Sequence, residues 1–79
     1  MSNKKISNNK IIANIKYQLN IKVKIDEKTK LKTLNEWDSL GHLTFIGIAD
    51  NDYSKRVTGD DLIECGTVGD LVKLINKDL

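Results

Sequence analysis

Hydrophobic residues recur at helical spacing in three stretches of the chain. In the first stretch they stand mostly at every fourth position and form one apolar stripe, which predicts an amphipathic helix over about residues 7–19. A second and more apolar stretch predicts a helix over residues 39–52, and a third predicts one over residues 68–77. The stripe of the first helix consists of Ile11, Ile12, Ile15 and Leu19. The chain is therefore predicted to be mainly helical.

Residues that favour helix starts mark the beginnings of three helices. Asp38 stands just before the second apolar stretch, where its carboxylate can accept a hydrogen bond from an N–H of the first turn. Thr58 and Thr67 each precede an aspartate by three residues, a variant of the capping box in which each side chain bonds to the other residue's N–H. These boxes predict a short third helix over residues 59–65 and the start of the fourth helix.

Residues 20–38 show no helical spacing. Ile21, Val23 and Ile25 alternate with lysines, and that alternation by itself would indicate a strand. No second strand is predicted with which this one could pair, so we expect a long ordered loop that apolar side chains hold to the core. The side chains expected to hold it are Ile21, Ile25, Leu31 and Leu34.

The length of 79 residues suits one domain with one core. A chain this short buries only roughly 60% of the surface that its unfolded form exposes, which makes a deep catalytic cleft unexpected. The expected fold is all-α: a four-helix bundle with a long loop between helices 1 and 2 and a short third helix, in a single domain over residues 1–79. Such a domain suits a binding surface or a single attachment point.

The composition excludes some kinds of structural site and argues against membrane insertion and secretion. Cys65 is the only cysteine, which excludes an internal disulfide and a zinc site built from cysteines of this chain. No apolar run approaches the roughly 20 residues that span a bilayer. The lysines near Met1 are not followed by the apolar block of a secretion signal. We therefore expect a soluble, cytoplasmic protein without a membrane segment.

The net charge of +2 conceals an uneven distribution. Residues 1–32 hold nine lysines and two acids, whereas residues 33–79 hold four basic and nine acidic residues. The lysine-rich part could bind nucleic acid, a membrane surface or an acidic partner, but scattered lysines are commonly a solvated face. Arg56 is the only arginine, and no helix clusters the basic residues that read DNA or RNA. A small nucleic-acid-binding or regulatory module is thus a distant alternative.

His42 and Cys65 are the side chains most able to support catalysis or metal binding. Cys65 follows Leu62 and Ile63 closely, a context typical of a buried and unreactive thiol. Only Asp38 stands one helical turn from His42 as a possible second ligand, and the chain has no glycine-rich phosphate loop. We therefore expect no catalytic residue, no metal site and no enzymatic activity.

The serine that starts the second helix admits two interpretations. Asp38-Ser39 can be a simple helix cap, which is common. Alternatively, the Ser39 hydroxyl is displayed for modification, because the free N–H groups and the positive dipole end of a helix start favour an attached phosphate. The residues around the pair favour the second interpretation.

The motif Asp38-Ser39-Leu40 resembles the D-S-L of acyl and peptidyl carrier proteins, which lies at the start of their second helix. The longer form W-D-S-L-x-H-L, from Trp37 to Leu43, is similar to that of free-standing carriers outside the main fatty-acid pathway. The similarity extends along nearly the whole chain, from the isoleucine pair of the first helix to the second capping box. The chain thus resembles the acyl carrier protein family, and the expected bundle is of acyl-carrier type.

The resemblance implies a phosphoprotein with a covalent 4′-phosphopantetheine cofactor on Ser39, attached from coenzyme A by a phosphopantetheinyl transferase. Acyl cargo would form a thioester with the terminal thiol and pass to enzymes of a specialised pathway of lipid or secondary-metabolite biosynthesis. Asp38 and Leu40 would be recognised by the transferase, and Asp50 by docking partners.

An aminoacyl or peptidyl carrier of the nonribosomal or D-alanyl type is the alternative within the same class. The expected partners are the phosphopantetheinyl transferase, an acyl- or aminoacyl-loading enzyme and downstream transferases. Nucleic acid and membrane are not expected partners, and the protein is expected to be a monomer.

The second helix departs from that of fatty-acid carriers. Thr44 stands where those carriers typically have glutamate, and Gly47 replaces a larger apolar residue, while Asp50 and Asp52 keep some acidity near the helix end. Fewer acids weaken electrostatic steering towards basic partners, so a housekeeping role in fatty-acid synthesis is not expected.

Two glycines interrupt the second helix, and each costs it about 1 kcal/mol relative to alanine. Gly41 and Gly47 either let a partner's backbone approach or open space for cargo, or they are neutral substitutions on an exposed face. Among the aromatic residues, Trp37 is expected to pack at the end of the loop, and Phe45 and Tyr53 are expected in the core or at its rim.

Overall fold

The structure is a computed structural model that describes residues 6–77. The described chain contains four α-helices and one turn of 3₁₀ helix, and its only β-structure is an isolated bridge between Lys30 and Thr67. The expected all-α class is confirmed for this part of the chain. The elements are α1 (Asn8–Gln18), η1 (Leu31–Thr33), α2 (Ser39–Tyr53), α3 (Gly59–Ile63) and α4 (Val68–Asn76).

The predicted helices agree with the observed ones to within two residues at every boundary. The predicted end at residue 65 is the least accurate, because α3 already ends at Ile63 and is a helix of little more than one turn. The expected domain also includes residues 1–5 and 78–79, which lie outside the described residues.

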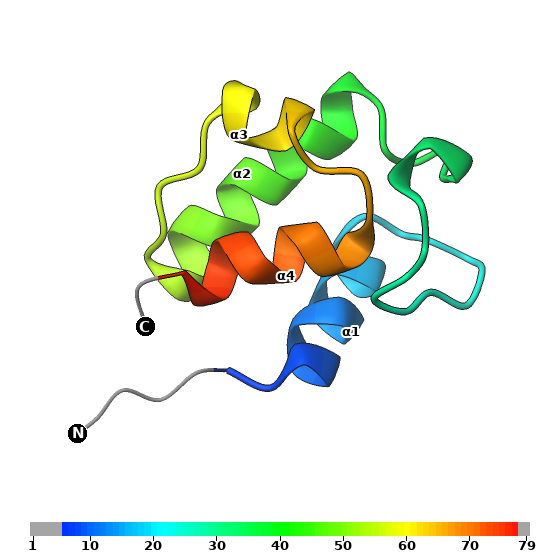
Figure 1. Cartoon of the computed structure of the whole chain (residues 1–79), viewed down its shortest axis with the longest axis horizontal. Coiled ribbons are helices and arrows are strands. Elements are labelled where there is room, and N and C mark those ends of the chain that lie inside the picture. The colour runs from blue at the N-terminus through cyan, green and yellow to red at the C-terminus, as the bar shows by residue number, and fades with distance from the viewer. Residues whose placement is uncertain (1–5, 78–79) are drawn as a thin grey trace.

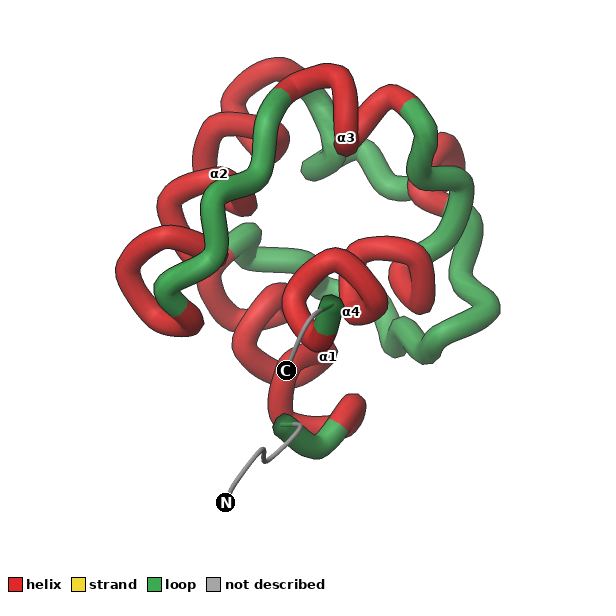
Figure 2. Tube along the Cα trace, turned by 60° about the vertical axis from the view of Figure 1, so that its left-hand side comes forward, coloured by secondary structure: helices red, strands yellow, loops and turns green. Residues whose placement is uncertain are grey.

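The helices surround a common core, with α1 in contact with both α2 and α4. Figure 1 shows the long α2 above α4, the short α3 between them along the chain, and the loop that follows α1 at one side of the molecule. Figure 2 shows the helices and loops arranged around a common centre. Buried apolar side chains from all of these elements form the core. The loop is therefore part of the wall of the core.

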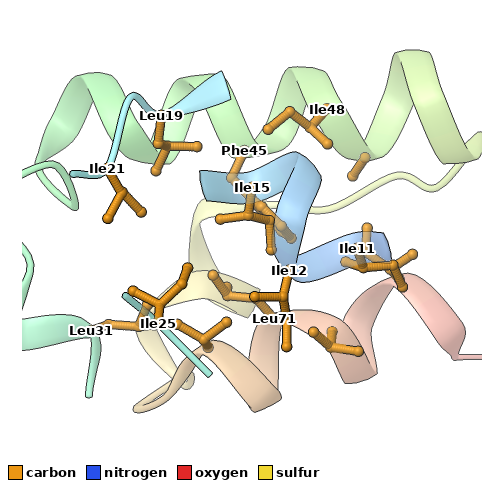
Figure 3. Packing of buried hydrophobic residues seen from close by; sticks show 14 of the residues in the cluster. Ile11, Ile12, Ile15, Leu19, Ile21, Ile25, Leu31, Phe45, Ile48 and Leu71 are labelled. Atoms are coloured by element: carbon orange, nitrogen blue, oxygen red, sulfur yellow. The ribbon is translucent and has the colours of Figure 1, made fainter. Parts of the chain in front are cut away.

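Apolar side chains from every element meet in one buried cluster (Figure 3). The stripe of α1 and the four apolar anchors of the loop are all buried, as predicted, whereas Val23 points away from the core and is 57% exposed. Phe45 is fully buried, and Trp37 and Tyr53 pack partly buried against the cluster, which confirms their expected positions. The largest fully buried side chains are Phe45, Ile11, Ile15, Leu62, Leu71, Ile75 and Val68.

The long loop is fastened to the start of α4 by backbone hydrogen bonds. The first N–H groups of a helix have no acceptor within it. In α4 the N–H of Val68 donates to the carbonyl of Thr29, and that of Gly69 donates to the carbonyl of Glu27, both at 2.9 Å. The N–H of Leu31 donates in turn to the carbonyl of Gly66 at 3.0 Å. The loop thus supplies the acceptors that α4 lacks, and α4 fixes the loop.

The predicted caps are present at three helix starts. Thr58 and Asp61 form a full capping box at α3, and Thr67 and Asp70 form another at α4. Asp38 caps α2 by accepting a hydrogen bond from the N–H of Gly41 at 2.9 Å. Each of these side chains replaces an acceptor that the helix cannot provide for itself.

The end of α1 turns the chain into the loop. Asn20 adopts the left-handed conformation with φ of 58°. Its N–H donates to the carbonyl of Tyr17, and the N–H of Ile21 donates to that of Lys16 at 3.0 Å. These two bonds form a Schellman motif, in which asparagine is one of the few residues that accept a positive φ.

Gly41 is buried, so its interpretation as a neutral substitution on an exposed face is wrong. A Cβ atom at this position would overlap the carbonyl oxygen of Glu36. The close approach that glycine permits here is made by the chain's own loop. Gly47 differs, because no atom lies within 4 Å of the place that its Cβ would occupy.

Replacing the two glycines by alanine is expected to have opposite effects. Gly41→Ala should lower the free energy of unfolding by about 1–3 kcal/mol, because the loop must move to admit the methyl group. Gly47→Ala should raise it by about 0.5–1 kcal/mol through helix propensity alone. Urea denaturation of both variants measures these changes, and destabilisation by Gly47→Ala would contradict the expectation.

The two capping boxes should make stability depend on acid pH. Hydrogen bonds from Thr58 lower the pKa of Asp61, and those from Gly66 and Thr67 lower the pKa of Asp70, both from 3.8. Because the folded-state pKa values lie below the unfolded ones, the stabilisation is present above about pH 4 and is lost as the pH falls through the folded-state values.

An Asp61→Asn/Asp70→Asn variant lacks both titrating groups. Its free energy of unfolding, measured in urea from about pH 5 to about pH 2, should fall less steeply than that of the unmodified chain. Parallel curves would show that the two carboxylates do not contribute.

Candidate functional site

The residues before α2 hold its first turn in a fixed geometry. Asp38 has an extended backbone, and its side chain accepts the N–H of Gly41 while its carbonyl accepts the N–H of His42, each at 2.9 Å. Glu36 packs its carbonyl against the glycine. The cap and the contact of Glu36 with Gly41 therefore determine where Ser39, the first residue of the helix, is held.

Ser39 is exposed at the first position of a 15-residue helix. Its own N–H and that of Leu40 belong to the first turn, where no acceptor exists within the helix. The helix dipole places partial positive charge at the same end. An oxygen-linked phosphate on Ser39 would meet hydrogen-bond donors and a favourable field, so the position fits a phosphate-containing group.

Apolar side chains are exposed on the turns that follow Ser39. Leu40 is 70% exposed and Leu43, one turn further, is 65% exposed. Residues three apart lie on the same side of a helix, so the two leucines form one apolar strip. Ile63 on α3 is also 76% exposed. Exposed apolar side chains that adjoin on one helix, as Leu40 and Leu43 do, are typical of an interaction surface.

The structure does not bring Asp50 to the other predicted site residues. Asp50 is exposed on α2 but stands eleven residues after Ser39, about 16 Å along the helix axis. Asp52 faces α1, where its carboxylate accepts hydrogen bonds from Asn14 at 2.9 Å and from Gln18 at 2.8 Å. The acidity near the end of α2 therefore serves partly to join the two helices.

The ring of His42 lies against Trp37, with the ring centroids 4.6 Å apart and the planes at 53°. Trp37 also contacts Phe45 edge-on, at 6.0 Å between ring centroids. The tryptophan thus links the end of the loop to α2, in agreement with its predicted packing role. His42 packs on this ring and belongs to the wall of a surface hollow.

A hollow of about 650 Å³ opens beside the start of α2. It lies between the loop, His42 on α2, the short α3 and the residues before α4. Sequence patterns gave no sign of it, because its walls come together only when the loop docks on α4. The hollow is lined by Lys30, Leu31, Lys32, Trp37, His42, Leu62, Ile63, Cys65, Gly66 and Thr67.

Cys65 lines the same hollow as His42, but its thiol is not activated. Burial raises its pKa to about 11, and the negative charges of Asp70, Asp61 and Glu64 add to the effect. The thiol donates to the carbonyl of Asp61, with 3.4 Å between the sulfur and the oxygen. Nucleophilic cysteines have lowered pKa values, so the environment of Cys65 is opposite to that of a catalytic thiolate.

Within residues 6–77, no cluster of three or more His, Cys, Asp or Glu side chains could hold a metal ion. No helix in that range is long and apolar enough to cross a membrane. Comparisons with protein-family models, curated proteins and solved structures find no match to this chain. The feature best suited to covalent modification is the exposed Ser39 at the fixed start of α2, beside the apolar strip of Leu40 and Leu43.

The raised pKa of Cys65 predicts slow alkylation. At pH 7 its thiolate fraction should be roughly a hundredfold below that of an exposed cysteine, because the pKa rises from 9.0 to about 11. Iodoacetamide labelling followed by mass spectrometry should therefore be much slower for the folded chain than for the chain in urea. Faster labelling of the folded chain would reveal an activated thiol.

Proposed function

We propose that this protein is an acyl carrier, which bears its cargo as a thioester on a 4′-phosphopantetheine arm attached to Ser39. The observation that supports this most directly is the exposed Ser39 hydroxyl at the first position of α2. It stands in an Asp-Ser-Leu motif whose aspartate is a formed helix cap. The hydroxyl is an attachment point, and the chemistry of attachment belongs to a phosphopantetheinyl transferase.

Attachment forms one bond and breaks one. Ser39 Oγ bonds to the phosphorus that carries pantetheine in coenzyme A, the adenosine bisphosphate part leaves, and the hydroxyl proton passes to a base of the transferase. The carrier needs no base of its own beside Ser39. Its contribution is to hold the hydroxyl outwards and to surround the resulting phosphodiester with the N–H groups and dipole of the helix start.

The residues around Ser39 favour docking through apolar contact. Residues 39–49 contain no aspartate, glutamate, lysine or arginine. The side chains offered to a partner there are Leu40 and Leu43, with Ile63 exposed on α3. Apolar contact is only weakly sensitive to salt, unlike the electrostatic steering of strongly acidic carriers. This chemistry is consistent with a carrier for a specialised pathway.

Two classes of cargo remain open for the proposed carrier, acyl groups and aminoacyl or peptidyl groups. An acyl carrier and an aminoacyl or peptidyl carrier use the same arm and the same serine, and they differ in the enzyme that loads the terminal thiol. Loading assays on the arm-bearing protein with an acyl-transferring and an adenylating enzyme separate them.

Intact mass spectrometry tests the attachment. After incubation with coenzyme A and a broad-specificity phosphopantetheinyl transferase, the chain should gain the mass of a single phosphopantetheine. Ser39→Ala should gain nothing. Ser7→Ala is the matched control, because Ser7 is another exposed serine before a helix and its side chain makes no capping hydrogen bond. This control should be modified as fully as the unmodified chain.

Two outcomes would contradict the proposal. The first is an adduct on Ser39→Ala, which would place the modification elsewhere. The second is no adduct on the folded chain when the same transferase modifies another carrier, which would leave Asp38-Ser39 as a helix cap only.

A further inference from the structure

A second surface with a distinct chemistry lies at the end of α1 and the beginning of the loop. We define the basic surface by Lys16, Tyr17, Lys22, Val23 and Lys24. The lysines at 22 and 24 are exposed, and Lys16 is partly exposed on the last turn of α1. Lysines continue along the loop at positions 28, 30 and 32, all of them exposed. Residues 33–79, in contrast, hold nine acidic and four basic residues.

The basic surface also exposes apolar groups and is concave. Tyr17 is 84% exposed beside Lys16 and Lys22, and Val23, between two lysines in the sequence, is 57% exposed. A hollow of about 440 Å³ lies beside them, lined by Ala13, Lys16, Tyr17, Asn20, Ile21 and Lys22. A solvated face needs neither an exposed aromatic ring nor a hollow. The combination of charge, apolar side chains and concavity indicates contact with another molecule.

The basic surface reaches the start of α2. Asn20 lines the hollow of the basic surface and also lines a second hollow of about 420 Å³, whose other walls include Asp38, Leu40 and Thr44. The side chain of Leu19 lies close to Gly41, 3.5 Å from the position that a Cβ atom would take. A partner that touches Leu40 can therefore extend across Asn20 onto Tyr17 and the lysines.

We propose that the basic surface binds an acidic patch on a partner protein, and that this partner is an enzyme that works on the group carried by Ser39. The second clause rests on the proposed function. Charge complementarity supplies the attraction and the direction of approach. Tyr17 and Val23 supply apolar contact, and the hollow accepts a side chain of the partner.

The charge distribution favours a protein over a polyanion. Residues 33–79 carry nine acids, among them Asp60, Asp61 and Glu64 in and beside α3. A nucleic acid or an anionic membrane extends its negative charge over a wide area and would be repelled by this part of the chain. A protein can confine its acidity to a patch that matches the basic surface, while it meets the neutral, apolar turns of α2 elsewhere.

The test is an NMR titration of the full chain with a short peptide of glutamate and leucine. The expected result is shifts of backbone amides confined to the basic surface, which weaken as salt rises from about 50 to about 500 mM. Lys22→Glu/Lys24→Glu should bind the peptide about tenfold more weakly. Arg56→Glu/Lys73→Glu is the matched control, because it changes the net charge equally at exposed positions away from this surface. The control should bind within about twofold of the unmodified chain.

Three results would overturn the inference. One is the absence of localised shifts. Another is an equal loss of binding in both double variants, which would leave only a net-charge effect. The third is tighter binding of single-stranded DNA, or of vesicles of phosphatidylglycerol and phosphatidylcholine, to the same residues, which would assign the surface to another class of partner.

The Ser39→Ala variant separates this inference from the proposed function. It should bind the peptide as the unmodified chain does, because Ser39 lies outside the basic surface. If the mass experiment shows no attachment while the titration shows binding, the claim that the partner is an enzyme acting on the Ser39 group is rejected. The claim that the basic surface binds acidic peptides is kept. If the mass experiment shows attachment and the titration shows no binding, the carrier function is kept and the proposed binding role of the basic surface is rejected.

Discussion

The arrangement of residues 6–77 depends on the hydrogen bonds between the long loop and the first turn of α4. The carbonyls of Glu27 and Thr29 accept the N–H groups of Gly69 and Val68, each at 2.9 Å. Gly69 allows this approach, because a Cβ there would come within 2.8 Å of the Glu27 carbonyl oxygen. Without these bonds, the N–H groups of Val68 and Gly69 would need water, because the capping box satisfies only those of Thr67 and Asp70.

A second close approach, between the loop and α2, fixes the geometry of the candidate site. The loop fixed at α4 returns to α2, where the carbonyl of Glu36 rests on Gly41 and Trp37 packs on His42 and Phe45. These contacts determine where α2 begins and leave Ser39 outside the core. The same packing therefore buries one face of α2 and leaves Ser39 exposed. A helix start fixed in this way would suit the proposed attachment site, which partner enzymes would have to recognise in one geometry.

Two chemically different surfaces meet at this site. The turns after Ser39 are neutral and present Leu40 and Leu43, whereas the end of α1 presents lysines around Tyr17. Asn20 lies between them, in contact with the hollows on both sides. Apolar contact favours tight packing near the serine, and charge favours a defined approach from one side. If the proposed carrier function holds, these two surfaces would let a chain with few acids on α2 select its partners.

The sequence by itself determined the elements, because helix periodicity and capping act over a few neighbouring residues. It located the helices to within two residues, the caps at Asp38, Thr58 and Thr67, and the serine on which the proposed function depends. Only the tertiary structure decided the burial of Gly41 against the Glu36 carbonyl and the hollow beside His42 and Cys65. These features arise where segments distant in sequence meet, and spacing along one chain carries no information about such contacts.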